Sequence, residues 1–223
     1  MTTKNPQRRT PFTRHYLILG LIGLALGMYL GFAPEYTPPQ PPVLKQATLL
    51  TPPKLVESPD LVDHDGKPFT GKSMQGQWSF FFFGYTNCPD VCPATMFVFK
   101  NIAKKLESMP KLKKQTRFVL ASIDPQRDTV AHLKQYVQYY HPGFLGLTGT
   151  SDNLHKFSRQ MGVIYGRSGS ENPNDKDNYL IDHSSAILLV NPQGHLQAVF
   201  SAPHDPDTML EDYQAIHSYL TGS

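Results

Sequence analysis

Cys88 and Cys92 are the only cysteines in the 223-residue chain, and they lie four positions apart. A disulfide between them would close a very short loop, which gains little chain entropy, and the chain has no other cysteine for a structural disulfide framework. Thiolates are both the nucleophiles and the metal ligands among cysteine species. The pair therefore predicts a metal site, a redox-active thiol pair, or both.

The residues around the pair favour the thiolate form. The segment GYTNCPDVCP follows an apolar run and precedes an expected helix, with Asp90 as the N-cap and Pro93 in the first turn. The dipole at a helix N-terminus favours thiolate over thiol. Side chains four positions apart near a helix start also share one face, so we expect both sulfurs to point the same way.

The elements that must position the thiols follow from the apolar pattern. The run WSFFFFGY at 78–85 is typical of a strand buried on both faces, and a helix at 90–107 should follow it. The other expected elements are a hairpin around Asp65-Gly66, strands at 117–123, 144–147, 186–190 and 195–200, and helices at 130–140, 151–161 and 207–220. Alternating strands and helices imply parallel pairing, and the late hairpin adds antiparallel strands. This order predicts an α/β thioredoxin-like fold, a central mixed sheet flanked by helices with an N-terminal hairpin.

That topology sorts the nine histidines as candidates for a third ligand. The cysteines follow a parallel strand, and an antiparallel strand begins at the same edge of the sheet. The strand at 186–190 should be antiparallel, so His183 is expected beside the thiols, with His204 as the only serious rival. Asp124 ends the second parallel strand at this edge. Two interpretations of it stay open, a carboxylate that orients a metal ligand or a turn residue before Pro125.

Two thiolates and one imidazole form a soft set of three ligands. Structural zinc usually has four ligands, and iron–sulfur clusters generally need four. Soft thiolates in a small ligand set suit Cu(I), and an added imidazole accommodates Cu(II). The sequence therefore favours copper at Cys88, Cys92 and His183. Met96 offers a weak thioether ligand, but a core methionine is the favoured interpretation.

The N-terminal quarter of the chain differs from the rest. Residues 16–33 are uncharged and mostly apolar, with basic residues before them and an acid after, which predicts an uncleaved transmembrane anchor; the alternative is a cleaved signal peptide. Seven prolines in 34–53 favour a semi-rigid spacer. The expected organisation is a cytoplasmic basic arm at 1–15, the anchor at 16–33, the spacer at 34–54 and a domain at 55–223. The domain should face the periplasm from the inner membrane, or the organellar equivalent.

The formal net charge of +3 also comes from the N-terminal arm. Lys4, Arg8, Arg9 and Arg14 contribute +4, and no acid precedes Glu35, so the remainder of the chain sums to −1. No basic face is left for a nucleic acid, which is excluded as a partner.

Four segments together carry a family resemblance. They are 63–67 (DHDGK), 83–93 (FGYTNCPDVCP), 122–129 (SIDPQRDT) and 181–185 (IDHSS). In these segments the chain resembles the Sco/SenC family of cytochrome oxidase assembly factors, from about Leu55 to the C-terminus. The cysteine segment is the most specific. Gln126 and Val130 stand where an acid and a proline are common in the family, and neither is a proposed ligand.

The resemblance implies that Cys88, Cys92 and His183 bind copper for the dinuclear copper A centre of cytochrome c oxidase subunit II, which would be the partner. A periplasmic copper chaperone is a further partner to consider. The protein would then be a metallochaperone rather than a turnover enzyme. The alternative is a thiol–disulfide oxidoreductase that keeps the cysteines of that centre reduced, with Cys88 and Cys92 as its redox pair. A peroxiredoxin-like peroxidase is disfavoured because Thr86 precedes Cys88 by two positions rather than three.

Overall fold

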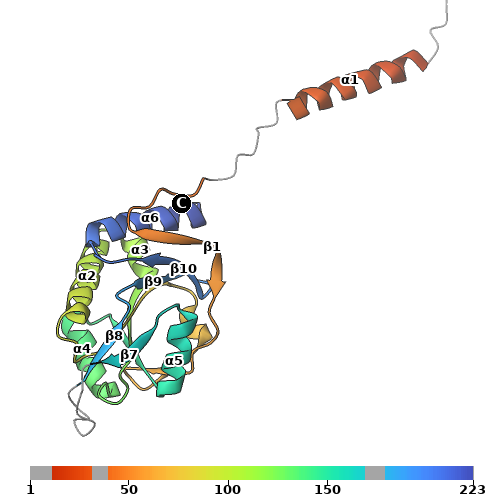
Figure 1. The fold of residues 1–223 in the computed structure, drawn as a ribbon. Helices are drawn as coiled ribbons and strands as arrows, with labels where there is room; N and C mark the ends of the chain where they lie inside the picture. Colours follow the sequence, from red (N-terminus) through yellow and green to blue (C-terminus); the bar gives the residue numbers. More distant parts are fainter. Residues whose placement is uncertain (1–11, 32–39, 169–178, 223) are drawn as a thin grey trace, which may run out of the picture. The chain divides into compact units, whose positions relative to one another are not determined.

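The computed structural model describes residues 12–31, 40–168 and 179–222. It divides into two units, Met1–Gln40 and Pro41–Ser223, which are described separately (Figure 1). In the first unit, helix α1 spans Phe12–Gly31. Across the described residues, no helix combines the length and the apolar character needed to cross a membrane. The transmembrane anchor predicted at 16–33 is therefore not supported.

The second unit is a mixed β-sheet with helices on its two faces. Its strands are β1 (Ala47–Leu55), β2 (Leu61–Asp63), β3 (Pro68–Phe69), β4 (Trp78–Gly84), β5 (Thr116–Ser122), β6 (Leu145–Thr148), β9 (Ile187–Val190) and β10 (His195–Phe200), in the spatial order β1-β10-β9-β4-β5-β6-β2-β3. Its helices are the single turn η1 (Gly71–Met74), α2 (Val91–Leu106), α3 (Pro110–Lys114), α4 (Val130–Tyr140), α5 (Ser151–Gln160) and α6 (Pro206–Thr221). A separate two-stranded sheet pairs β7 (Tyr165–Ser168) with β8 (Leu180–His183).

The predicted α/β architecture is confirmed in its main lines. Strand β4 pairs in parallel with β5 and antiparallel with β9, which makes the central sheet mixed as expected. The hairpin around Asp65-Gly66 is the antiparallel pair β2–β3. Because β4 and β9 run in opposite directions, the end of β4 and the start of β9 meet at one edge of the sheet, where the cysteines and His183 were expected.

The core explains why β4 is apolar on both faces. All seven of its residues are buried. Phe80 contacts Phe99 of α2 and Tyr213 of α6 on one face of the sheet. Phe81 contacts Phe157 of α5 on the other face. Because side chains alternate along a strand, a run of aromatic residues is needed to fill both layers. Figure 1 shows α2 and α5 on opposite sides of the second unit.

Strand β1 uses residues that the sequence analysis assigned to the proline-rich spacer. It is the outermost strand and pairs antiparallel with β10, with a shift in register between Leu49 and Lys54. Pro52 and Pro53 lie inside this irregular stretch. A proline removes a ladder hydrogen bond, so prolines are tolerated at edge strands and bulges. That tolerance explains how a proline-containing segment joins the sheet.

A buried carboxylate holds the chain just before β1. Asp212 of α6, which is 3% exposed, accepts hydrogen bonds from the backbone N–H groups of Lys45, Gln46 and Ala47 at 2.9, 2.7 and 2.7 Å. Three N–H donors compensate the desolvation of the buried carboxylate. The start of the β1 segment is thereby attached to the last helix of the chain.

Candidate metal centre

The two thiols lie where β4 passes into α2. Cys88 is half-buried in the connecting loop, Cys92 is fully buried in the first turn of the helix, and both are free thiols. Asp90 is the N-cap residue of α2, as predicted, although its side chain makes no capping hydrogen bond. The Cys88 Sγ accepts the backbone N–H of Cys92 instead, at 3.4 Å. The Tyr85 N–H donates to the Cys92 Sγ at 3.5 Å.

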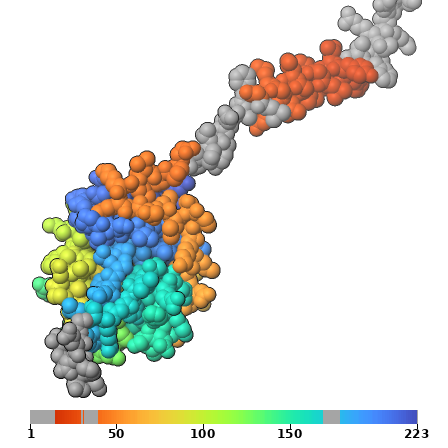
Figure 2. Space-filling view, in the orientation of Figure 1, coloured from red at the N-terminus to blue at the C-terminus, as the bar shows by residue number. Residues whose placement is uncertain are grey.

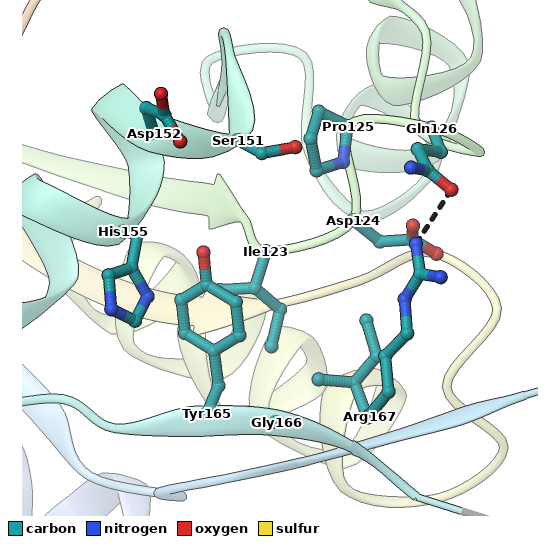
Figure 3. A pocket seen from close by; sticks show the side chains of 11 residues that line it. Ile123, Asp124, Pro125, Gln126, Ser151, Asp152, His155, Tyr165, Gly166 and Arg167 are labelled. Carbon is teal, nitrogen blue, oxygen red and sulfur yellow. Dashed lines mark hydrogen bonds between the residues drawn. The ribbon is translucent and has the colours of Figure 1, made fainter.

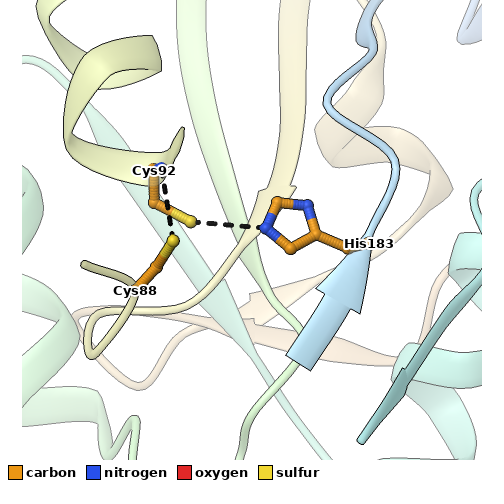
Figure 4. Close-up of side chains that lie close together, drawn as sticks. All are labelled: Cys88, Cys92 and His183. Carbon is orange, nitrogen blue, oxygen red and sulfur yellow. Dashed lines mark hydrogen bonds between the residues drawn. The ribbon is translucent and has the colours of Figure 1, made fainter. Parts of the chain in front are cut away.

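His183 is the last residue of β8 and lies beside the thiols, although it follows Cys92 by 91 residues in the sequence. Its Nε2 lies 3.6 Å from the Cys92 Sγ (Figure 4). One donor atom from each of Cys88, Cys92 and His183 lies within 4.8 Å of the others. Within the described part of the chain, this is the only group of three or more His, Cys, Asp or Glu side chains that could hold a metal ion.

The surroundings of the imidazole determine which of its nitrogens is available. The His183 Nδ1 lies 3.0 Å from the carbonyl oxygen of Ser184. A carbonyl only accepts, so Nδ1 carries the proton and the Nε2 lone pair faces the sulfur. The ring also meets Phe82 and Tyr85 edge to face, with centroid distances of 5.6 and 6.0 Å. These contacts keep the imidazole in one orientation.

The two sulfurs differ in charge. Hydrogen bonding from the Cys92 thiol, helped by the N–H groups of Asp90 and Cys92, lowers the pKa of Cys88 to about 4. The pKa of Cys92 is raised, because its thiol donates to Cys88 and is buried. At neutral pH the metal-free pair is therefore an accessible thiolate at Cys88 beside a buried thiol at Cys92. This is the form in which a pair both attracts a soft cation and starts disulfide exchange.

Gly84 sets how closely β4 approaches the buried sulfur. A Cβ at this position would lie 2.8 Å from the Cys92 Sγ and 2.7 Å from the Phe82 ring. Gly84→Ala should therefore displace the sulfur and lower the free energy of unfolding by about 1–3 kcal/mol, as overpacking does. Urea unfolding and the Cu(II) absorption spectrum would measure both effects. Gly166→Ala is the matched control, because a Cβ there meets open space. Equal behaviour of the two variants would contradict the steric argument.

The structure places the other candidates outside this group. The His204 Nε2 lies 2.7 Å from the carbonyl oxygen of Ser185, so His204 supports the segment after His183. Asp124 is buried and accepts hydrogen bonds from Arg127 and from the Tyr179 hydroxyl. Neither of these contacts involves Cys88, Cys92 or His183. Met96 is 1% exposed and belongs to the core.

Sequence reasoning overlooked four polar or aromatic residues that surround the site. They are Tyr85, Asp128, Arg127 and Tyr179. Tyr85 accepts the N–H of Ile181 in β8 through its hydroxyl oxygen, at 3.2 Å, and thereby joins the cysteine loop to the histidine strand. Tyr85, Arg127 and Asp128 fall in segments that carry the family resemblance. The contacts that join these residues to distant parts of the chain span 42 to 96 residues of sequence.

Comparison with known proteins identifies the family. The SCO1/SenC family profile matches residues 48–218. The chain belongs to this family. The resemblance inferred from the sequence is thus confirmed, and the SCO1/SenC match includes Cys88, Cys92 and His183.

Individual relatives extend the comparison. The protein SCO2 homolog, mitochondrial, of Mus musculus is 37% identical over 165 residues, which cover 72% of this chain and 63% of the relative. The chain thus spans less than two thirds of the mouse protein. The crystal structure of Arabidopsis thaliana ScoI with copper bound is 31% identical with a TM-score of 0.66, covering 74% of this chain and 99% of that one. Yeast Sco1 with copper bound is 31% identical with a TM-score of 0.65, covering 73% and 87%.

Proposed function

We propose that Cys88, Cys92 and His183 bind one copper ion, which the protein carries as cargo to subunit II of a cytochrome c oxidase for its copper A centre. The observation that carries the proposal is the convergence of two sulfurs and one imidazole nitrogen within 4.8 Å. The Arabidopsis and yeast relatives with bound copper support it. The family resemblance supports the client, cytochrome c oxidase.

The donor set fits copper chemically. Cysteine sulfur is a soft ligand that selects Cu(I), and imidazole also accepts Cu(II). Cys88 is already a thiolate, and the Nε2 of His183 is the ring nitrogen directed at the sulfurs. Cys92 must lose its proton, and copper uptake should therefore release about one proton per ion. Three donors rather than a closed set of four suit a cargo that must be passed on.

Anaerobic reconstitution of the reduced protein tests this function. We expect one copper per chain for both Cu(I) and Cu(II), with X-ray absorption showing sulfur ligands and nitrogen. Titration of a weakly buffered solution should detect the released proton. The Cys88→Ser, Cys92→Ser double variant is the control and should bind no copper. Stoichiometric retention of zinc with negligible copper binding would refute the proposal.

A second function is favoured by the difference between the two thiols. Cys88 is the more exposed and has the lowered pKa, whereas Cys92 is buried beside it. In an oxidoreductase, the Cys88 thiolate would attack a partner disulfide and release one partner sulfur as a thiolate. Cys92 would lose its proton and attack Cys88, releasing the second. The partner is then reduced, and Cys88 and Cys92 are joined by the disulfide. The cysteines of the copper A centre are the proposed partner.

Both functions require the second unit, Pro41–Ser223, to lie outside the reducing cytoplasm, in the periplasm or its organellar equivalent. The mouse relative, named as mitochondrial, supports such a location. Alkaline phosphatase becomes active only where its own disulfides form, so a fusion to the C-terminus of the chain should be active. Activity of a cytoplasmic reporter in the same fusion position would contradict this location.

A further inference from the structure

A buried carboxylate holds the loop that carries Cys88. Asp128, which is 0% exposed, accepts hydrogen bonds from the Thr86 hydroxyl at 2.5 Å and the Thr86 N–H at 3.2 Å. It also accepts the Ser122 hydroxyl at 2.6 Å, at the end of β5. Thr86 lies two residues before Cys88. The cysteine loop is thereby attached to the sheet at one defined point.

A tyrosine holds the strand that carries His183. Tyr179 immediately precedes β8, and its hydroxyl donates to Asp124. The guanidinium carbons of Arg127 and Arg167 lie 3.7 and 4.2 Å from the centre of its ring, at cation–π distance. Arg127 Nη1 also donates to the Tyr179 carbonyl oxygen at 3.1 Å. Both the ring and the backbone at the start of this strand are therefore fixed.

These two sets of contacts form two supporting arms: the first joins Asp128 to Thr86, and the second joins Tyr179 to Asp124, Arg127 and Arg167. Asp124 and Arg167 of the second arm line a surface pocket of about 310 Å³ between β7 and α5. Figure 3 shows Arg167 reaching from β7 toward Gln126, to whose Oε1 it donates at 2.6 Å, with Asp124 beside them. In Figure 2 the teal region that contains α5 and β7 lies at the surface of the second unit. The arm is therefore close to solvent, whereas Asp128 is enclosed.

Both arms end on one turn, residues 124–128. The N–H groups of Arg127 and Asp128 donate to the Asp124 carbonyl oxygen at 3.2 and 2.9 Å, and the Asp124 N–H donates to the Ser122 hydroxyl at 3.0 Å. The turn is thus rigid and attached to β5. The thiols and the imidazole lie more than 90 residues apart in sequence, yet each is held to this same turn.

We propose that Asp128 and Tyr179 are the positioning residues of the copper site, with Asp128 placing the thiols through Thr86 and Tyr179 placing His183 through β8. The inference rests on the proposed copper-binding function. Neither residue is one of the three donors, so both act through other residues. Their common attachment to the 124–128 turn keeps the imidazole at a fixed distance from the sulfurs, as preorganised metal sites require.

Two conservative variants separate the arms. Tyr179→Phe keeps the ring between its arginine contacts and removes only the hydroxyl, and Thr86→Val keeps the shape of Thr86 and removes only its hydroxyl donor. Thr86→Ser keeps the hydroxyl donor and should behave like the wild-type protein. Tyr139→Phe is the control for losing a tyrosine hydroxyl, because Tyr139 is 75% exposed.

We expect both variants to weaken Cu(II) binding by about ten-fold, the lower end of the loss seen when a group supporting a metal ligand is removed. In the metal-free protein their signatures should differ. Tyr179→Phe should accelerate amide hydrogen exchange at 180–183 in the metal-free protein. After loading with Cu(II), it should also show reduced nitrogen coupling in the electron paramagnetic resonance spectrum. Thr86→Val should change the pH profile of Cys88 alkylation and leave exchange at 180–183 unchanged.

Wild-type copper affinity and unchanged metal-free signatures in both variants would overturn the inference. So would identical changes in both signatures accompanied by an equal fall in melting temperature, because those indicate general destabilisation. If the wild-type protein binds no copper, the proposed function fails, and the two metal-free signatures still decide whether the arms position Cys88 and His183.

Discussion

Replacing His183 with alanine should abolish the Cu(II)–thiolate absorption and weaken copper binding by at least ten-fold, while the Cys88–Cys92 disulfide still forms. His183 is the proposed nitrogen donor, with its Nε2 3.6 Å from the Cys92 Sγ. Cu(II) depends on nitrogen donation more than Cu(I) does. Removing even a group that supports a ligand costs about 10–100-fold in affinity. Copper titration monitored by absorption, with mass spectrometry of the oxidised protein, measures both outcomes.

His204→Ala is the matched control for that experiment. His204 contacts the carbonyl oxygen of Ser185, two residues beyond His183, but is not one of the three converging donors. We expect its loss to leave the copper spectrum in place. A spectrum that is lost in His204→Ala and kept in His183→Ala would show that the ligand assignment is wrong. The same pair of variants separates the two proposed functions, because disulfide exchange needs only the thiols.

Alkylation of the reduced, metal-free protein should modify Cys88 selectively, at a rate nearly constant from pH 8 to pH 5. The lowered pKa of about 4 keeps Cys88 a thiolate across this range, and the rate should fall only as the pH approaches that value. An ordinary thiol with a pKa of about 8.5 is only about one-thousandth thiolate at pH 5.5, so its rate falls steeply. Mass spectrometry of samples in which alkylation by iodoacetamide has been stopped at successive times identifies the modified cysteine and gives the alkylation rate.

The buried partner supplies the internal control. Cys92 has no exposed surface, and burial alone raises its pKa, so Cys92 in the Cys88→Ser variant should react slowly at every pH below 8. A rate at Cys88 that drops ten-fold for each pH unit below 8 would contradict the thiolate assignment. Equal modification of the two cysteines would contradict the difference in burial.

The strong apolar pattern of the central strands made the fold predictable from the sequence. The run in β4 is apolar because both faces of the strand are buried, so its position and the parallel neighbour β5 could be predicted. His183 was placed at the correct edge because β9 is antiparallel to β4. The short pair β7–β8 was missed. Each strand has four residues of mixed burial, and a strand this short does not show a recognisable alternation of apolar and polar residues.

The supporting contacts of the site were less predictable for a different reason. Asp90 is the N-cap residue of α2 as expected, but the hydrogen bond from the Cys92 N–H to the Cys88 sulfur was not predicted. Asp124 was predicted to lie at the edge of the sheet where it is found. Its hydrogen-bond partner Tyr179, 55 residues away in the sequence, was not predicted. Such hydrogen bonds depend on how distant segments meet in space, and local propensity contains no information about them. Their sequence signal is only an unexplained polar residue beside a buried strand.

The pairing of β1 with β10, and the attachment of residues 45–47 to Asp212, has a consequence for biosynthesis. The first strand of the sheet has only the last strand as its partner, and β9 completes the centre beside β4. Such long-range closure is slow and cannot precede the arrival of the C-terminal segments. The sheet therefore stays incomplete while the chain is being synthesised or translocated. Cys88 and Cys92 emerge long before His183, so the two thiols are the first part of the proposed copper site to become available.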